Sequence, residues 1–156
     1  MEARGVSKEL AAAFGSLFFI GITAGRFLSG IVSERFGDRN MIRIGTAVIV
    51  SGAVMMLLPV SSNLLSLIGL VVVGLGCAPV YPSIIHSTPA NFGAENSQAI
   101  IGIQMASAYT GSTFMPPLFG LIADHISISL FPVYILVIFC AMFLMVETTY
   151  KKTARG

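Results

Sequence analysis

Residues 25–39 read GRFLSGIVSERFGDR, and they contain the sharpest change of character in this chain of 156 residues. An apolar segment that carries a single charge, Arg26, runs into the charged turn ERFGDR at residues 34–39. A second apolar segment begins directly after that turn. This order predicts two helices joined by a tight polar turn around Gly37.

The composition places much of the chain in a lipid bilayer. Hydrophobic residues make up 55% of the sequence and charged residues only 10%, and the mean hydropathy is +0.88. A globule of this length could not cover such an apolar interior with so little polar surface. The net charge of +2 comes without a run of basic residues, which argues against a nucleic-acid partner. Cys77 and Cys140 lie in apolar stretches, as small core residues do.

Apolar stretches of roughly the 17 to 25 residues that a spanning helix requires recur along the chain. Five of them lie near residues 10–32, 41–60, 64–86, 97–123 and 126–146. Backbone groups in lipid must satisfy their own hydrogen bonds, so these stretches predict an all-α integral membrane bundle. The first stretch is longer than the core of a signal peptide and four others follow it, so we expect it to be retained.

The distribution of basic residues predicts the orientation in the membrane. The side that is richer in Lys and Arg is expected to face the cytoplasm. One side would hold Arg35, Arg39, Arg43, Lys151, Lys152 and Arg155, and the other only Arg4 and Lys8. We therefore expect the protein to lie in the plasma membrane, with residues 1–9 outside the cell and the basic tail 147–156 in the cytoplasm.

The charged turn resembles the signature loop of the major facilitator superfamily of membrane transporters. That loop joins two spanning helices on the cytoplasmic side with the pattern Gly-x-x-x-Asp-Arg-x-Gly-Arg-Lys. The matching positions here are Gly30, Glu34, Arg35, Gly37 and Arg39. Glu34 keeps the carboxylate of the pattern, whereas Asp38 stands where the family usually has a basic residue. The resemblance implies a secondary transporter that moves a small polar solute by alternating access.

The resemblance also implies a partner. The family has twelve helices in two halves of six, and the five stretches here resemble helices eight to twelve, which implies a missing N-terminal half. The segments GLGCAPVYPS at 74–83 and GSTFMPPLFGLIAD at 111–124 resemble parts of fucose-permease-like sugar transporters, which favours a sugar as solute. The alternative is a truncated membrane protein that does not transport and is an assembly partner or an inactive fragment.

Two interpretations fit the charged turn. As a conformational latch, the Glu34 carboxylate would be stabilised by a helix end or an arginine in one state and released in the other. As an ordinary turn, its charges would only fix the topology. Arg26 lies about 12 Å before Glu34 along the helix. We expect it to brace the cytoplasmic gate, ahead of contacting substrate or snorkelling to the interface.

Side chains suited to an uncharged solute gather in the fourth stretch. Gln104, Ser107 and Gly111 share one helix face, and Tyr109, together with Tyr81 of the third stretch, could stack on a sugar ring. Structural hydrogen bonds between helices explain the same residues about equally well. The sequence contains no recognisable motif for catalysis, a metal or a cofactor, so neither an enzyme nor a cofactor is predicted.

Prolines and small residues mark places where helices bend or approach each other. The prolines within spans are Pro79, Pro82, Pro116 and Pro117. Each removes a backbone hydrogen bond, so we expect a local bend or unwinding that is either a static kink or a hinge. Close helix contacts are expected at pairs of small residues four apart: Gly21 with Gly25, Gly102 with Ala106, and Ser107 with Gly111.

Overall fold

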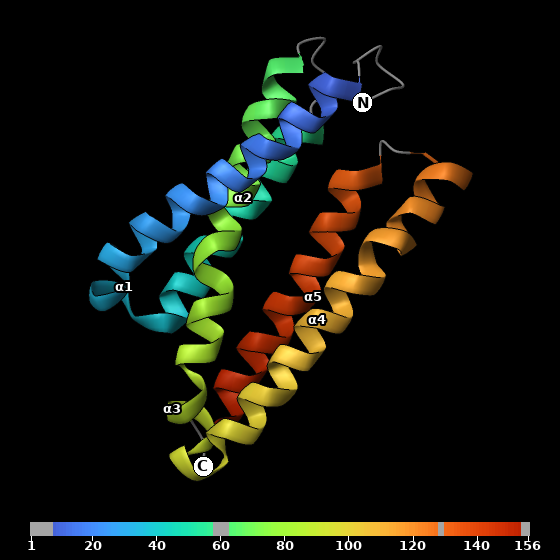
Figure 1. Cartoon of the computed structure of the whole chain (residues 1–156). Helices are drawn as coiled ribbons and strands as arrows, with labels where there is room; N and C mark the ends of the chain where they lie inside the picture. Colours follow the sequence, from blue (N-terminus) through green and yellow to red (C-terminus); the bar gives the residue numbers. More distant parts are fainter. Residues whose placement is uncertain (1–7, 58–62, 128–129, 154–156) are drawn as a thin grey trace. The chain divides into compact units, whose positions relative to one another are not determined.

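The computed structural model describes residues 8–57, 63–127 and 130–153, which are helical almost throughout (Figure 1). In chain order the helices are α1 (Lys8–Leu57), α2 (Asn63–His86), α3 (Thr88–Phe92), α4 (Ala94–His125) and α5 (Phe131–Thr153). The chain divides into two compact units, Met1–Pro82 and Ser83–Gly156. The all-α fold predicted from the sequence is confirmed.

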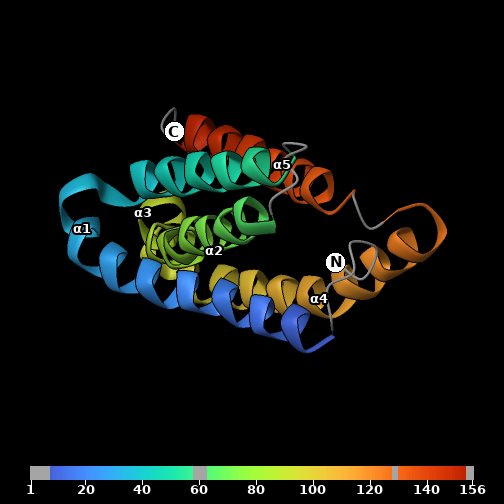
Figure 2. The same ribbon diagram turned by 90° about the horizontal axis from the view of Figure 1, so that it is seen from above.

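Helix α1 is broken at a single residue. Gly37 has φ 71 and ψ 159, a backbone conformation that only a residue without Cβ adopts readily. The helix before the break, residues 8–36, is the first arm, and the helix after it, residues 38–57, is the second arm. Figures 1 and 2 show the two arms on either side of α2. The charged turn predicted at residues 34–39 is therefore confirmed as a reversal, but all of it except Gly37 is helical.

The second arm contacts α2 through two pairs of glycines. A Cβ added at Gly45 would lie 2.7 Å from Gly76 O, and one added at Gly52 would lie 2.7 Å from Gly69 O. On each helix the two glycines are seven residues apart, which is about two turns, so the contact repeats along the interface. The two backbones thus approach closely at these glycines, where an added Cβ would collide with the facing carbonyl.

The first arm reaches α2 in the same way. Gly21 and Gly25 are both buried. A Cβ added at Gly21 would collide with Val71 O, and one added at Gly25 would lie 2.7 Å from Leu75 O. The close contact predicted for this glycine pair is confirmed.

Apolar residues point both into and out of this unit. The buried positions of the second arm follow the helical period and are Met41, Ile42, Gly45, Thr46, Ile49, Gly52 and Ala53. On the first arm, Phe19, Phe27 and Ile31 are 67%, 74% and 64% exposed. Large apolar side chains turned outward on a helix of this length are what a surrounding bilayer accommodates.

In the second unit, α3, α4 and α5 are held by a few side-chain contacts. Gly93, with φ 83, separates α3 from α4. At the end of α5, Thr153 Oγ1 lies 3.4 Å from Asn91 Oδ1 of α3. Near its start, the ring of Phe131 lies edge-on to that of Phe119 of α4, with centroids 5.2 Å apart. Helix α5 therefore runs antiparallel to α4.

Three described segments are long and apolar enough to cross a membrane: Gly15–Leu57, Leu65–His86 and Phe131–Thr153. The first has 43 residues. At about 1.5 Å per residue it is roughly twice as long as the hydrocarbon core is thick, so its two arms amount to two crossings. Helix α4 has 32 residues but is not among the three, because polar residues and prolines fill its middle.

Several boundaries differ from those expected. The last helix begins at Phe131 rather than near 126 and continues to Thr153, so the expected tail 147–156 is helical over its described part. The short helix α3 lies between the expected spans 64–86 and 97–123, and Pro89 occupies its first turn, a position that needs no backbone donor. Residues 1–7 and 58–62 lie outside the described residues, and so do most of the expected segment 1–9 and the end of the span 41–60.

Candidate functional site

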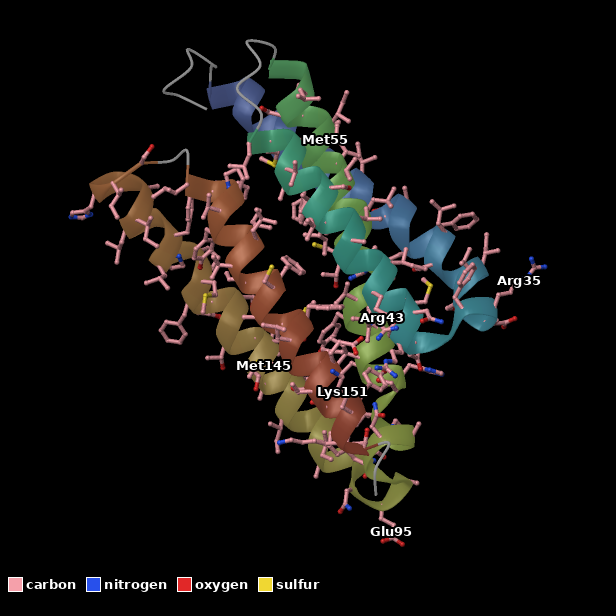
Figure 3. All side chains as sticks on the ribbon, turned by 180° about the vertical axis from the view of Figure 1, so that it is seen from behind. Arg35, Arg43, Met55, Glu95, Met145 and Lys151 are labelled. Carbon is pink, nitrogen blue, oxygen red and sulfur yellow. The ribbon has the colours of Figure 1, made fainter. Side chains whose placement is uncertain are left out.

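In the charged turn, the charged side chains before Gly37 differ in exposure from those after it. Glu34 and Arg35 end the first arm and are both exposed, and Arg35 projects outward from the bend in Figure 3. Among the described residues, no hydrogen bond or ion pair involves either side chain. Asp38 and Arg39, directly after the break, are half-buried and each interacts with other groups.

Local hydrogen bonds hold the backbone of the turn. Asn40 Nδ2 donates to Phe36 O across the break at 3.0 Å, so it pairs one of the carbonyls that a helix end leaves without a donor. Ser33 Oγ donates to Gly30 O at 3.4 Å. The reversal thus depends on Gly37 for its conformation and on Asn40 for its cap. Sequence reasoning missed Asn40, although Asn is a residue that caps helix ends.

Arg26 lies on the first arm beside Gly25. Its side chain is exposed, and its carbonyl accepts a hydrogen bond from Ser29 Oγ at 3.1 Å. The chain from Arg26 to Glu34 is helical throughout, so the spacing of about 12 Å expected from the helical rise holds. Its roles as a gate brace, a substrate contact or a snorkelling residue stay predictions.

Gln104 of α4 has a partner within its own unit. Its Oε1 lies 3.1 Å from Thr88 Oγ1, and Thr88 is only 1% exposed. The same hydroxyl lies 3.0 Å from Ile84 O, so its single hydrogen serves one acceptor at a time. Gln104 therefore connects α4 to α3, as the structural interpretation of this residue requires. The structure thus uncovers Thr88, which no sequence pattern indicated.

Tyr109 lies on a different face of α4. It is 74% exposed and comes five residues after Gln104, which is about 140° around the helix axis. Ser107 is also exposed. Tyr81 is 41% exposed and belongs to the other unit. The described part of α4 has no buried residue, and a Cβ added at Gly111 would meet no described atom within 4 Å.

The four prolines lie inside helices that continue past them. Helix α2 runs through Pro79 and Pro82, and α4 runs through Pro116 and Pro117, so neither helix unwinds there. Pro79 is buried, whereas the other three are exposed. The expected loss of a backbone donor at each proline follows from its covalent structure and holds in both helices.

One residue of α5 braces the proline pair of α4. The hydroxyl of Tyr134 donates to Met115 O, immediately before Pro116, at 3.1 Å. The Tyr134 ring also lies 5.1 Å, centroid to centroid, from that of Phe119. Sequence reasoning missed Tyr134, because a contact with a residue 19 positions earlier leaves no local pattern.

The remaining reactive side chains do not form a cluster. Cys77 and Cys140 are free thiols. In the described ranges, no group of three or more His, Cys, Asp or Glu could hold a metal ion. The charged turn and the exposed face of α4 are therefore the two candidate functional regions.

The comparison with protein families gives one match. The family model described as Major Facilitator Superfamily matches residues 1–155. This match covers both units and the charged turn. Neither the curated proteins nor the solved structures contain a significant match.

Proposed function

The chain belongs to the major facilitator superfamily, a family of membrane transporters, and we propose that it forms the C-terminal part of a carrier for a small, uncharged polar solute such as a sugar. Its helices would act as helices eight to twelve of the family, and an N-terminal half would complete the pathway. Transport would proceed by alternating access, with the solute held between the halves near the middle of the membrane.

The observation that carries this proposal is the polar character of α4. Its 32 residues are long enough to cross a bilayer at about 1.5 Å per residue, yet its centre holds Gln104, Ser107 and the sequence YTGST at 109–113. Polar groups within a membrane are costly against lipid, so they usually face a bundle interior or a water-filled cavity. Helix α4 is therefore the natural wall of a solute pathway.

The charged turn supports a part in switching between states. Glu34 and Arg35 are exposed and without a partner among the described residues. A latch must bind its partner in one state and release it in the other, and this conformation fits the released state. In the proposal Glu34 and Arg35 form the latch, Gly30, Gly37 and Arg39 shape it, and Arg26 braces it from within the membrane.

The test is an uptake assay in cells that express the chain together with the N-terminal half. The probes are radiolabelled L-fucose, D-glucose, mannitol, L-alanine and choline. We expect saturable uptake of at least one sugar or polyol, and much slower uptake of alanine and choline. The absence of saturable uptake of every probe would overturn the proposal and favour a non-transporting assembly partner.

A control addresses the need for two halves. Purified chain in liposomes, without the N-terminal half, should show no saturable flux of the same probes, because a pathway formed between two halves lacks one wall. Saturable flux from the chain alone would contradict the two-half proposal and require a homo-oligomeric carrier.

A further inference from the structure

Two adjacent prolines in α4 leave two adjacent carbonyl groups without helical donors. In an α-helix the N–H of residue i+4 donates to the C=O of residue i, and proline has no N–H. Pro116 and Pro117 therefore cannot donate to Ser112 O and Thr113 O. Both Ser112 and Thr113 are exposed. This segment thus presents backbone acceptors that its own helix cannot satisfy.

The hydroxyl groups of the same two residues do not act as outward donors. Ser112 Oγ donates to Tyr109 O at 2.9 Å, and Thr113 Oγ1 donates to the same oxygen at 2.8 Å. A hydroxyl group has a single hydrogen, so only its lone pairs remain available. Both oxygens of each residue are therefore acceptors, and the segment is rich in acceptors and poor in donors.

The prolines of α2 differ in this respect. Pro79 removes the donor to Leu75 O, but that oxygen lies 2.7 Å from the Cβ position of Gly25 on the first arm. Pro82 removes the donor to Ala78 O, and Ala78 is only 3% exposed. The freed carbonyls of α2 are therefore covered by packing, whereas those of α4 belong to exposed residues.

An uncovered carbonyl in a membrane helix needs a donor from elsewhere. Lipid tails supply none, so such groups occur where water or other protein groups reach them. Tyr109 lies at i relative to Ser112 at i+3 and Thr113 at i+4, and thus on the same helix face. Tyr109 as a whole is 74% exposed. Freed acceptors, together with an exposed aromatic residue about one turn before them, suit a molecule with several hydroxyl donors and an apolar face.

We propose, on the basis of the transport function proposed above, that Tyr109, Ser112 and Thr113 form a subsite for an uncharged solute with several hydroxyl groups, a sugar or a polyol. Its hydroxyls donate to Ser112 O and Thr113 O, and the Tyr109 ring covers its apolar face. The acceptor-rich surface repels an anion. The carboxylates of α4, Glu95 and Asp124, lie near its two ends, so α4 itself places no counter-charge for a cation beside the subsite.

The test restores the missing donors. In a Pro116→Ala/Pro117→Ala variant, the new N–H groups can bond to Ser112 O and Thr113 O. Alanine also favours helix over proline, so the variant should fold at least as well as the parent. Equilibrium binding of D-glucose and of mannitol to the carrier assembled with its N-terminal half should weaken roughly tenfold, the effect of one or two lost hydrogen bonds.

Deoxyglucoses separate the subsite from a hinge effect. A deoxyglucose that lacks the hydroxyl bound by a freed carbonyl should bind the parent more weakly than glucose does, but should bind the double variant about as well as glucose does. A hinge effect would change transport rates without this pattern in binding. Pro79→Ala is the matched control, because the carbonyl it would satisfy is already covered, and it should change binding less than about twofold.

Each outcome decides one question. Glucose binding that is equal in the parent and the double variant would overturn the subsite. Tighter binding of choline or sodium than of any sugar or polyol would also overturn the subsite. Neither of these two results would contradict the proposal that the protein is a transporter. Loss of saturable binding for every probe in the parent would overturn the transport function and the subsite together.

Discussion

The glycine contacts between the second arm and α2 allow a quantitative test of the first unit. In Gly52→Ala the new Cβ would lie 2.7 Å from Gly69 O and 2.9 Å from Val73 N, whereas ordinary contact begins at 3.4 Å. Both of these neighbours are backbone atoms, so no side-chain rotation relieves the clash. The two helices must separate locally by several tenths of an ångström.

The expected cost follows from two opposing terms. Overpacking of this kind costs about 1–3 kcal/mol, whereas replacing a helical glycine by alanine stabilises the helix by about 0.5–1 kcal/mol. Gly30→Ala, on the first arm in the same unit, isolates the second term, because its Cβ would meet no described atom within 4 Å. The free energy of opening, that is, of separating the second arm from α2, should therefore differ between the two variants by about 1–3 kcal/mol. This difference corresponds to roughly fivefold to 150-fold in the opening equilibrium.

The thiol of Cys77 reports that opening. Cys77 is half-buried on α2, one turn beyond Val73, and a Cys140→Ser background makes it the sole thiol. In detergent micelles, maleimide labelling tracks the opening equilibrium when closing is faster than labelling. Cys77 in Gly52→Ala should label faster than in Gly30→Ala by the factor above. Equal labelling rates would refute the assignment of a close glycine contact.

Three further predictions concern the charged turn. Single cysteines at Ser33 and Ser127 in a cysteine-free background should label from opposite sides of the membrane, and labelling of both from outside would contradict the predicted orientation. Gly37→Ala, which forces a side chain into φ 71, should lower the free energy of unfolding by about 1–2 kcal/mol in a thermal unfolding experiment. Gly30→Ala, with open space around its Cβ, should not lower it. In the carrier assembled with its N-terminal half, Glu34→Gln should slow uptake while solute affinity stays within a few-fold, and an unchanged rate would favour a purely topological turn.

The sequence predicted those features of the fold that arise locally. Apolar length indicates a spanning helix, and Gly37 between two charged segments indicates a reversal, because both depend on neighbouring residues alone. The pairs Gly45 with Gly76 and Gly52 with Gly69 were not predicted. Nothing in either helix shows which residue of the other it will face, since that register results from packing between distant segments.

The roles of the candidate site residues likewise depend on tertiary contacts that the sequence does not show. Gln104 was predicted either to bind solute or to connect helices, and its amide suits both roles equally. Only the position of Thr88 on α3, 3.1 Å from Gln104 Oε1, provides a structural partner. Tyr109 carried the same uncertainty in the sequence, but no described residue buries it. Tertiary neighbours, rather than residue type, thus separate the two.

The two proline pairs also differ through their tertiary neighbours. By local rules Pro79 and Pro116 are equivalent, because each removes one donor from a helix in an apolar stretch. Gly25 lies fifty positions before Leu75, and its missing side chain lets the first arm cover the carbonyl that Pro79 frees. Ser112, whose carbonyl Pro116 frees, is in contrast an exposed residue. In water this difference would matter little, since solvent would satisfy either carbonyl. In a bilayer it decides whether a proline is a packed kink or an open acceptor, and so it marks α4 as the helix that must face something other than lipid.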